Sequence, residues 1–168
     1  AAFHFDKARH IEPDRANFHS DYGTAINMMG KSAEAVAPFK RAVELDPKNF
    51  PGQLGLSSAL IGVNDYEPAI VAARAATQST PNRPEGWVNL SIALNRSGQG
   101  AQAVAILEEA LAIMPGEFLL HTNLAAALNY RPEPTPQRVF EAHVNLGRVL
   151  AAAYGGGIRS FSNDPNPD

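Results

Sequence analysis

The chain has 168 residues, of which 45% are hydrophobic and none is cysteine, and it carries a formal net charge of −3. A chain near 150 residues is long enough for one domain or one repeat array, and the absence of cysteine and of any Lys/Arg cluster argues against disulfides, thiolate chemistry and nucleic-acid binding. No apolar run approaches the roughly 18 residues of a membrane span, and residues 1–10 lack a signal peptide's apolar centre. We therefore expect a soluble, cytoplasmic protein with no membrane partner.

Several columns of residues recur every 34 positions. The proline column and the two alanine columns hold Pro13, Pro47, Pro81 and Pro115; Ala8, Ala42, Ala76 and Ala110; and Ala1, Ala35, Ala69 and Ala103. A fourth column stays small, with Gly23, Ser57, Ser91 and Ala125. Each unit has two apolar stretches at helical spacing, and its proline ends it because proline cannot donate the next helical hydrogen bond. The repeat predicts an all-α array of stacked helical hairpins.

In chain order, residues 1–15 carry only second-helix columns, so we expect the second helix of a truncated unit and a fragment of a longer protein. Full units follow at 16–49, 50–83 and 84–117, and residues 118–131 form the first helix of a partial unit. In the second unit Asn64 replaces the turn glycine. Pro38 falls inside a second helix, where it should cost about 3 kcal/mol or kink the helix.

The end of the chain departs from the repeat. Residues 132–154 predict a Pro-rich turn followed by a capping or junction helix, with Thr135 as N-cap and Pro136 in the first helical position. Glycines stop this helix, and residues 155–168 predict a flexible linker or tail.

These columns resemble the tetratricopeptide repeat (TPR). The third unit matches the pattern best, through Trp87, Leu90, Leu94, Gly98, Ala103, Ala110 and Pro115. The resemblance implies a right-handed α-solenoid that binds proteins or peptides on a concave face lined by the first helix of each hairpin.

A narrower resemblance covers residues 118–168. The segments that carry it are 121–124, 128–130, 139–143 and 162–168, which are similar to the junction after the repeats in bacterial O-GlcNAc-transferase-like glycosyltransferases of the SPINDLY type. It implies a substrate-recruiting arm whose catalytic domain lies beyond residue 168. The alternative is a free-standing TPR adaptor or assembly scaffold with no attached enzyme, in which open repeat ends could also support self-association.

No chemistry-bearing constellation is found within the chain. The five histidines lack metal-ligand spacing, and no nucleophile, base and orienting group share a pattern. His121 occupies the same repeat column as Trp87, which favours a packed helix residue. We expect no catalytic residue, metal site or cofactor here.

Binding residues are expected on the first helices. An asparagine offers both a donor and an acceptor, so a row of them can pair with the backbone of an extended peptide. Such a row resembles the asparagine ladder of O-GlcNAc transferases at Asn89 and Asn123, and is interrupted at Asp21 and Gly55; the alternative is a solvated polar helix face. The candidate peptide-binding residues are Asn89, Asn123, Asn95, Asn129, Asn27, Asp21, Arg96 and Tyr130.

The columns that hold a cationic carboxylate clamp in chaperone-binding repeat proteins carry no cation here. They hold Ser20, Leu54, Val88 and Thr122, and Thr24, Ser58, Ile92 and Ala126. We therefore expect the partner to be an uncharged extended segment or another part of the same protein.

Overall fold

A computed structural model describes residues 2–129 and 135–154. Within these ranges every element is a helix: α1 Ala2–Ile11, α2 Ala16–Met28, α3 Ser32–Leu45, α4 Phe50–Gly62, α5 Tyr66–Ser79, α6 Pro84–Arg96, α7 Gly100–Ile113, α8 Phe118–Asn129 and α9 Pro136–Tyr154. The predicted Pro-rich turn at 132–134 and the predicted tail at 155–168 lie outside the described residues. None of the described helices is long and apolar enough to cross a membrane.

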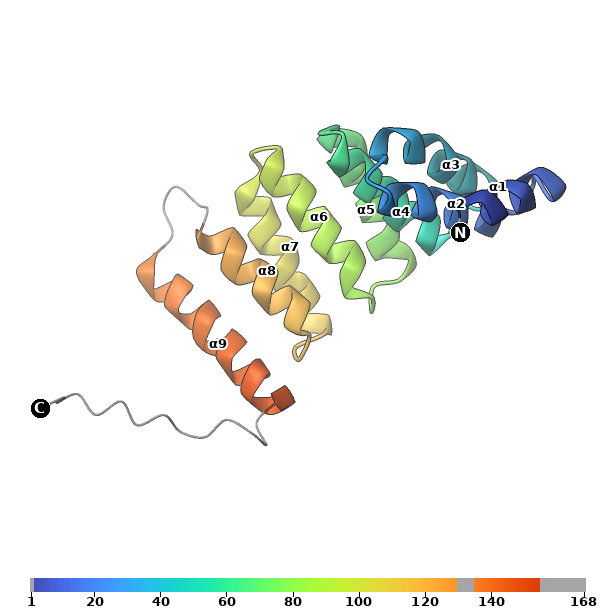
Figure 1. The fold of residues 1–168 in the computed structure, drawn as a ribbon. Helices are drawn as coiled ribbons and strands as arrows, with labels where there is room; N and C mark the ends of the chain where they lie inside the picture. The colour runs from blue at the N-terminus through green and yellow to red at the C-terminus, as the bar shows by residue number, and fades with distance from the viewer. Residues whose placement is uncertain (1, 130–134, 155–168) are drawn as a thin grey trace, which may run out of the picture.

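The helices form a row of hairpins that follow one another from α1 to α9 (Figure 1). The pairs α2–α3, α4–α5 and α6–α7 pack internally, and α8 packs on α9. The first helices α2, α4, α6 and α8 contact one another in succession. The second helices α3, α5 and α7 each pack on the next first helix but, in the described part of the chain, their backbones do not approach one another closely. This arrangement is the predicted all-α solenoid of helical hairpins.

The alanine columns lie at the helix crossings. Their described members in the three hairpins are all 0% exposed: Ala35, Ala42, Ala69, Ala76, Ala103 and Ala110. A methyl group at these points lets two helix axes approach closely, whereas a larger side chain would force them apart. The small residues of these columns therefore allow the helices to pack closely at their crossings.

In the three hairpins from α2 to α7, the turn between the two helices uses one left-handed residue. Gly30, Asn64 and Gly98 are 34 positions apart and have φ angles of 76°, 62° and 83°. Glycine adopts this conformation without steric cost, and asparagine is one of the few other residues that tolerate it. Asn64 thus makes the same turn as the glycine that it replaces.

A side-chain N–H donates to the carbonyl of the terminating proline in all four units. The donors stand six residues after each proline: His19 Nε2 to Pro13 O at 2.7 Å, Gln53 Nε2 to Pro47 O, Trp87 Nε1 to Pro81 O at 2.9 Å and His121 Nε2 to Pro115 O at 2.8 Å. The bond fixes the entry of each first helix against the turn before it. His121 is therefore a structural helix residue, as its column predicts.

Helix α3 continues through Pro38 from Ser32 to Leu45. Proline leaves the carbonyl of Glu34 without its helical donor, but Glu34 is exposed, so water can donate to that oxygen instead. The sequence predicts that the last helix starts at Pro136 with Thr135 as its N-cap. In the structure α9 begins at Pro136, and the amide of Arg138 donates to Thr135 O at 2.9 Å.

Candidate functional site

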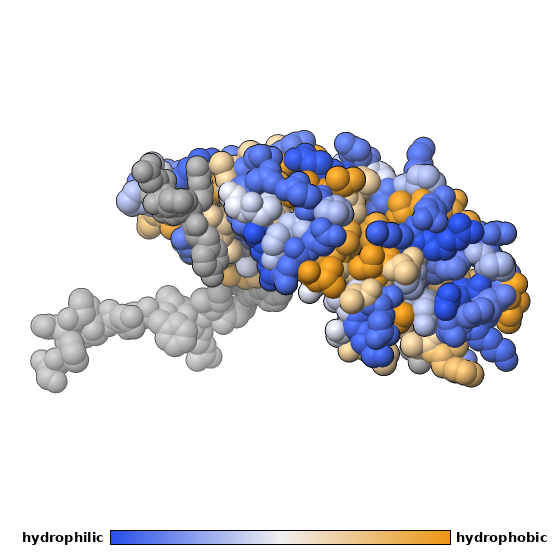
Figure 2. Space-filling view, turned by 90° about the horizontal axis from the view of Figure 1, so that it is seen from above, coloured by the Kyte–Doolittle hydropathy of each residue, from blue (hydrophilic) through white to orange (hydrophobic). Residues whose placement is uncertain are grey.

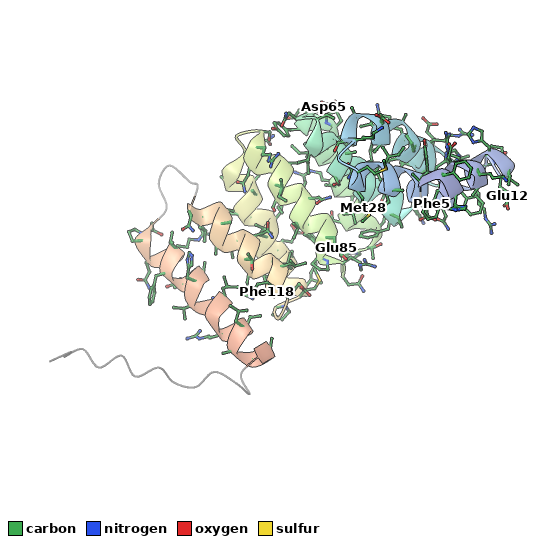
Figure 3. All side chains as sticks on the ribbon, viewed as in Figure 1. Phe5, Glu12, Met28, Asp65, Glu85 and Phe118 are labelled. Atoms are coloured by element: carbon green, nitrogen blue, oxygen red, sulfur yellow. The ribbon has the colours of Figure 1, made fainter. Side chains whose placement is uncertain are left out.

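A hollow of about 320 Å³ crosses three consecutive first helices. Helices α2, α4 and α6 supply nine of its lining residues and α3 supplies one: Thr24, Asn27, Met28, Phe39, Pro51, Leu54, Gly55, Ser58, Glu85 and Asn89. We call this feature the first-helix hollow. Figure 3 shows Met28 and Glu85, which come from α2 and α6, on the same side of the array.

Two of the predicted asparagines, Asn27 and Asn89, line the first-helix hollow and also join its helices. The Asn27 amide donates to Ser58 Oγ on α4 at 3.3 Å, and its Oδ1 accepts from Ser32 Oγ at 2.8 Å. Asn89 Nδ2 on α6 donates to Ser57 Oγ at 2.9 Å and to Leu54 O at 3.3 Å, both on α4. These amides are therefore held in place, and Asn89 Oδ1 has no partner among the described residues.

The other predicted residues lie outside the lining of this hollow. Asp21, Arg96 and Asn129 are exposed and Asn95 is half-buried, whereas Tyr130 lies outside the described residues. Asn123 stands in the column of Asn89 but donates to Leu119 O of its own helix at 2.8 Å. The two ladder asparagines therefore make different contacts.

Gly55 interrupts the asparagine row because an aromatic ring occupies the space. A Cβ atom on Gly55 would lie 2.0 Å from Phe39 Cε1 and 2.3 Å from its Cζ, and one on Gly23 would lie 2.9 Å from Cε1. The Phe39 ring of α3 thus fits between α2 and α4 only because both helices carry glycine there. One unit later the same two positions hold Ala73 and Asn89, so a small side chain faces a larger polar one.

The charge in the lining is balanced by a neighbour. Glu85 is the one ionisable residue among the described residues that line the hollow, and it accepts hydrogen bonds from Arg83 Nη2 at 2.8 Å and Nε at 3.1 Å. These hydrogen bonds lower the pKa of the Glu85 carboxyl below its ordinary value against the opposing effect of partial burial. The Arg83 guanidinium in turn lies 5.0 Å from the Phe50 ring centroid. The hollow therefore offers no free cation to an acidic ligand.

Apart from Thr24, the remaining lining is apolar, and of its residues Leu54 was singled out in the sequence but neither Met28 nor Pro51 was. Met28 is 84% exposed, an unusual state for a large apolar side chain, and Leu54 and Pro51 complete the wall. In the view from above, hydrophobic side chains reach the surface near the middle of the molecule, between more hydrophilic regions (Figure 2). The sequence signal for this surface is the glycine at position 55, in a column that is polar in every other unit.

A second type of hollow lies between neighbouring second helices. Three such hollows repeat along the array, and the middle one, of about 550 Å³, is floored by Leu56 and Leu60 and walled by Val43 and Val71. All three hollows also have charged residues in their lining: Lys40 and Glu67 in the middle one, Arg9, Glu34 and Arg41 in the one before it, and Arg74 and Glu109 in the one after it. No group of three or more His, Asp or Glu side chains in the described ranges could hold a metal ion.

No family model matches the chain. It is 30% identical over 116 residues to the Hsp70-Hsp90 organizing protein of Triticum aestivum, a match that covers 69% of this chain and 20% of that relative. The chain thus spans about a fifth of that protein's length.

Two solved structures share the fold at low identity. The MamA RS-1 ArsTM double mutant superposes with a TM-score of 0.77 at 16% identity, covering 91% of this chain and 85% of that one. The second TPR domain of human RPAP3, solved in complex with the HSP70 peptide SGPTIEEVD, has a TM-score of 0.60 at 20% identity and covers 65% of this chain and 91% of that one. With its 34-residue period and stacked hairpins, the chain has the tetratricopeptide-repeat fold that these structures share.

Proposed function

We propose that this chain is a protein-binding scaffold and that its first-helix hollow holds an extended, uncharged peptide segment of a partner. The single observation that carries the proposal is the lining of the hollow. Fixed amides and hydroxyls of Asn27, Ser58 and Asn89 surround apolar walls, with no Lys or Arg among the described residues that line it. Such a surface can hydrogen-bond to a peptide backbone and cover apolar side chains.

The expected ligand differs from the one in the RPAP3 complex. The HSP70 peptide printed for that structure, SGPTIEEVD, contains three acidic residues. An acidic segment needs cationic partners, and burying a carboxylate without one is costly. We therefore infer that this chain selects neutral segments, and that the fold shared with RPAP3 does not carry over the same ligand.

The test is a titration of labelled, end-capped nonapeptides against the chain, followed by fluorescence anisotropy. Replacing both asparagines of the proposed row, Asn89→Ala and Asn123→Ala, should weaken binding of neutral peptides roughly thirtyfold, since each of the two amide hydrogen bonds contributes about 1 kcal/mol. Asn82→Ala, an exposed residue outside the hollow, is the matched control. Unchanged affinity in the double variant would remove the asparagines from the binding surface.

A narrower proposal concerns the protein to which this array belongs. The sequence of residues 118–168 supports a substrate-recruiting arm attached to an O-GlcNAc-transferase-like catalytic domain, and this support comes from the sequence resemblance alone. The alternative is an adaptor with no attached enzyme. Reading the codons that follow Asp168 separates the two, because an apolar strand opening a doubly wound domain favours the first and a stop codon favours the second.

A further inference from the structure

We propose that the first-helix hollow contains an apolar subsite, floored by the Phe39 ring beside Gly55, that takes one large apolar side chain of the bound peptide. This inference rests on the proposed peptide-binding function and adds its specificity. It concerns one place in the array, the junction of α2 and α3 with α4, and it distinguishes this junction from the next one along the chain.

The floor of the subsite is aromatic because of a pair of residues that match each other. Phe39 is only 1% exposed, yet it belongs to the lining of the hollow, because Gly55 presents no side chain between the ring and the open space. At the following junction the equivalent positions are Ala73 and Asn89, and there an amide lies where the ring would be. A peptide crossing both junctions therefore meets an apolar surface at the first and a polar one at the second.

The walls of the subsite suit a side chain rather than a whole ligand. Beside the Phe39 ring, the apolar lining comes from Met28 on α2 and from Pro51 and Leu54 on α4. A volume of about 320 Å³ lies at the lower end of the range for ligand pockets. One Leu, Met or Phe side chain would fit in this space and leave room for part of the peptide backbone at the level of the rim amides.

The rim selects against a charged occupant. Asn27, Ser58 and Asn89 are neutral, and the Glu85 carboxylate is engaged by Arg83. An acidic side chain in the subsite would lose its hydration without gaining a cation, so it should be excluded. The occupant is thus an uncharged apolar residue inside an extended segment of a partner protein.

The decisive variant exchanges the matched pair. Phe39→Ala combined with Gly55→Asn and Gly23→Ser copies the combination that the chain already uses at Ala73, Asn89 and Ser57, where the amide donates to the hydroxyl, so the helices have a native precedent for packing. The probes are end-capped Ser/Asn/Gly nonapeptides whose central residue is Leu, Phe, Ala or Asp. The wild-type chain should bind the Leu and Phe peptides about tenfold more tightly than the Ala peptide and reject the Asp peptide, since one buried large side chain is worth about a factor of ten.

In the exchanged variant the preference for Leu or Phe over Ala should fall to about twofold while the Ala peptide still binds. A second variant guards against a failure to fold: Met28→Asp alters a wall residue that is 84% exposed and should cut Leu-peptide binding about tenfold. Its matched control is Met29→Asp, an adjacent exposed methionine outside the lining, which should leave binding unchanged.

The outcomes separate the two proposals. If the wild-type chain binds the Leu and Ala peptides equally, the subsite is wrong and the peptide groove stands. If the preference survives both the pair exchange and Met28→Asp, the apolar side chain binds elsewhere and the subsite is again wrong. If no peptide binds the wild-type chain at millimolar concentration, the peptide groove and its subsite both fall.

Discussion

Two neighbouring junctions of this array solve the same packing problem in opposite ways. Where α3 meets α4, the Phe39 ring fills the crossing and Gly55 gives it room. Where α5 meets α6, Ala73 leaves the space open and Asn89 fills it with an amide that binds Ser57 and Leu54. The first junction is stabilised by apolar burial and the second by hydrogen bonds, although both occupy the same two positions of the repeat. Repeat positions are therefore filled in pairs, and one member cannot be interpreted without the other.

The largest expected effect comes from emptying the first junction. Phe39→Ala removes a ring that is 1% exposed and should lower the free energy of unfolding by about 3–5 kcal/mol. Urea unfolding followed by circular dichroism measures the loss. The matched change at the second junction, Ala73→Gly, should cost only about 1 kcal/mol, and an equal loss in the two variants would contradict the comparison.

Filling the first junction should have the next largest effect. A Cβ on Gly55 would lie 2.0 Å from the ring, so Gly55→Ala should cost about 1–3 kcal/mol despite the better helix propensity of alanine. In a Phe39→Ala background the same change should become neutral or stabilising. The measurement is a double-mutant cycle by urea unfolding, and additive effects would show that the two residues are not a matched pair.

Breaking the hydrogen bonds of the second junction should have a smaller effect. Asn89→Ala loses the two bonds to α4 and should lower the free energy of unfolding by about 1–2 kcal/mol. The control is Asn123→Ala, because that amide bonds only to its own helix and its loss should stay within about 0.5 kcal/mol. Thermal melts of the two variants give the order, and the reverse order would remove the cross-helix role of Asn89.

The smallest effect is a dependence on pH at the rim of the second junction. The folded state lowers the pKa of Glu85, so its contribution to stability is present above the carboxyl's unfolded pKa and is lost as pH falls through the lower folded value. Glu85→Gln should thus melt at a slightly lower temperature than the wild-type chain at pH 7, and at the same temperature as the wild-type chain at low pH. Melting curves from pH 7 to pH 2.5 test this, and a difference that grows on acidification would reverse the sign. The equivalent position of the first junction, 34 residues earlier, is Pro51, which does not titrate, so no such pH dependence is expected there.

The sequence was sufficient for the architecture because its signals are local. The prolines, the buried alanines and the left-handed turn at Gly30 and Gly98 each act within one hairpin, and the start of α9 at Pro136 follows from its own cap. Asn64 was visible as a substitute in the turn. Each of these features depends on residues that are close along the chain.

Only part of the candidate site could be predicted from the sequence, because its contacts join residues of different hairpins. Two of the candidate asparagines, Asn27 and Asn89, line the first-helix hollow. The row treated Gly55 as a gap, whereas it is one half of a contact with Phe39, 16 residues earlier and on another hairpin. Only the stacking of units brings the two together, so neither residue type indicated an aromatic floor.

The donors to the proline carbonyls show what the repeat preserves. Histidine, glutamine and tryptophan have little in common in size or charge, yet His19, Gln53, Trp87 and His121 each place one N–H on the carbonyl six residues before it. We therefore expect substitutions at this position to be tolerated when the new side chain keeps a reachable nitrogen donor, and to be destabilising when it does not. The four units can thus carry different residue types at this position and keep the same hydrogen bond.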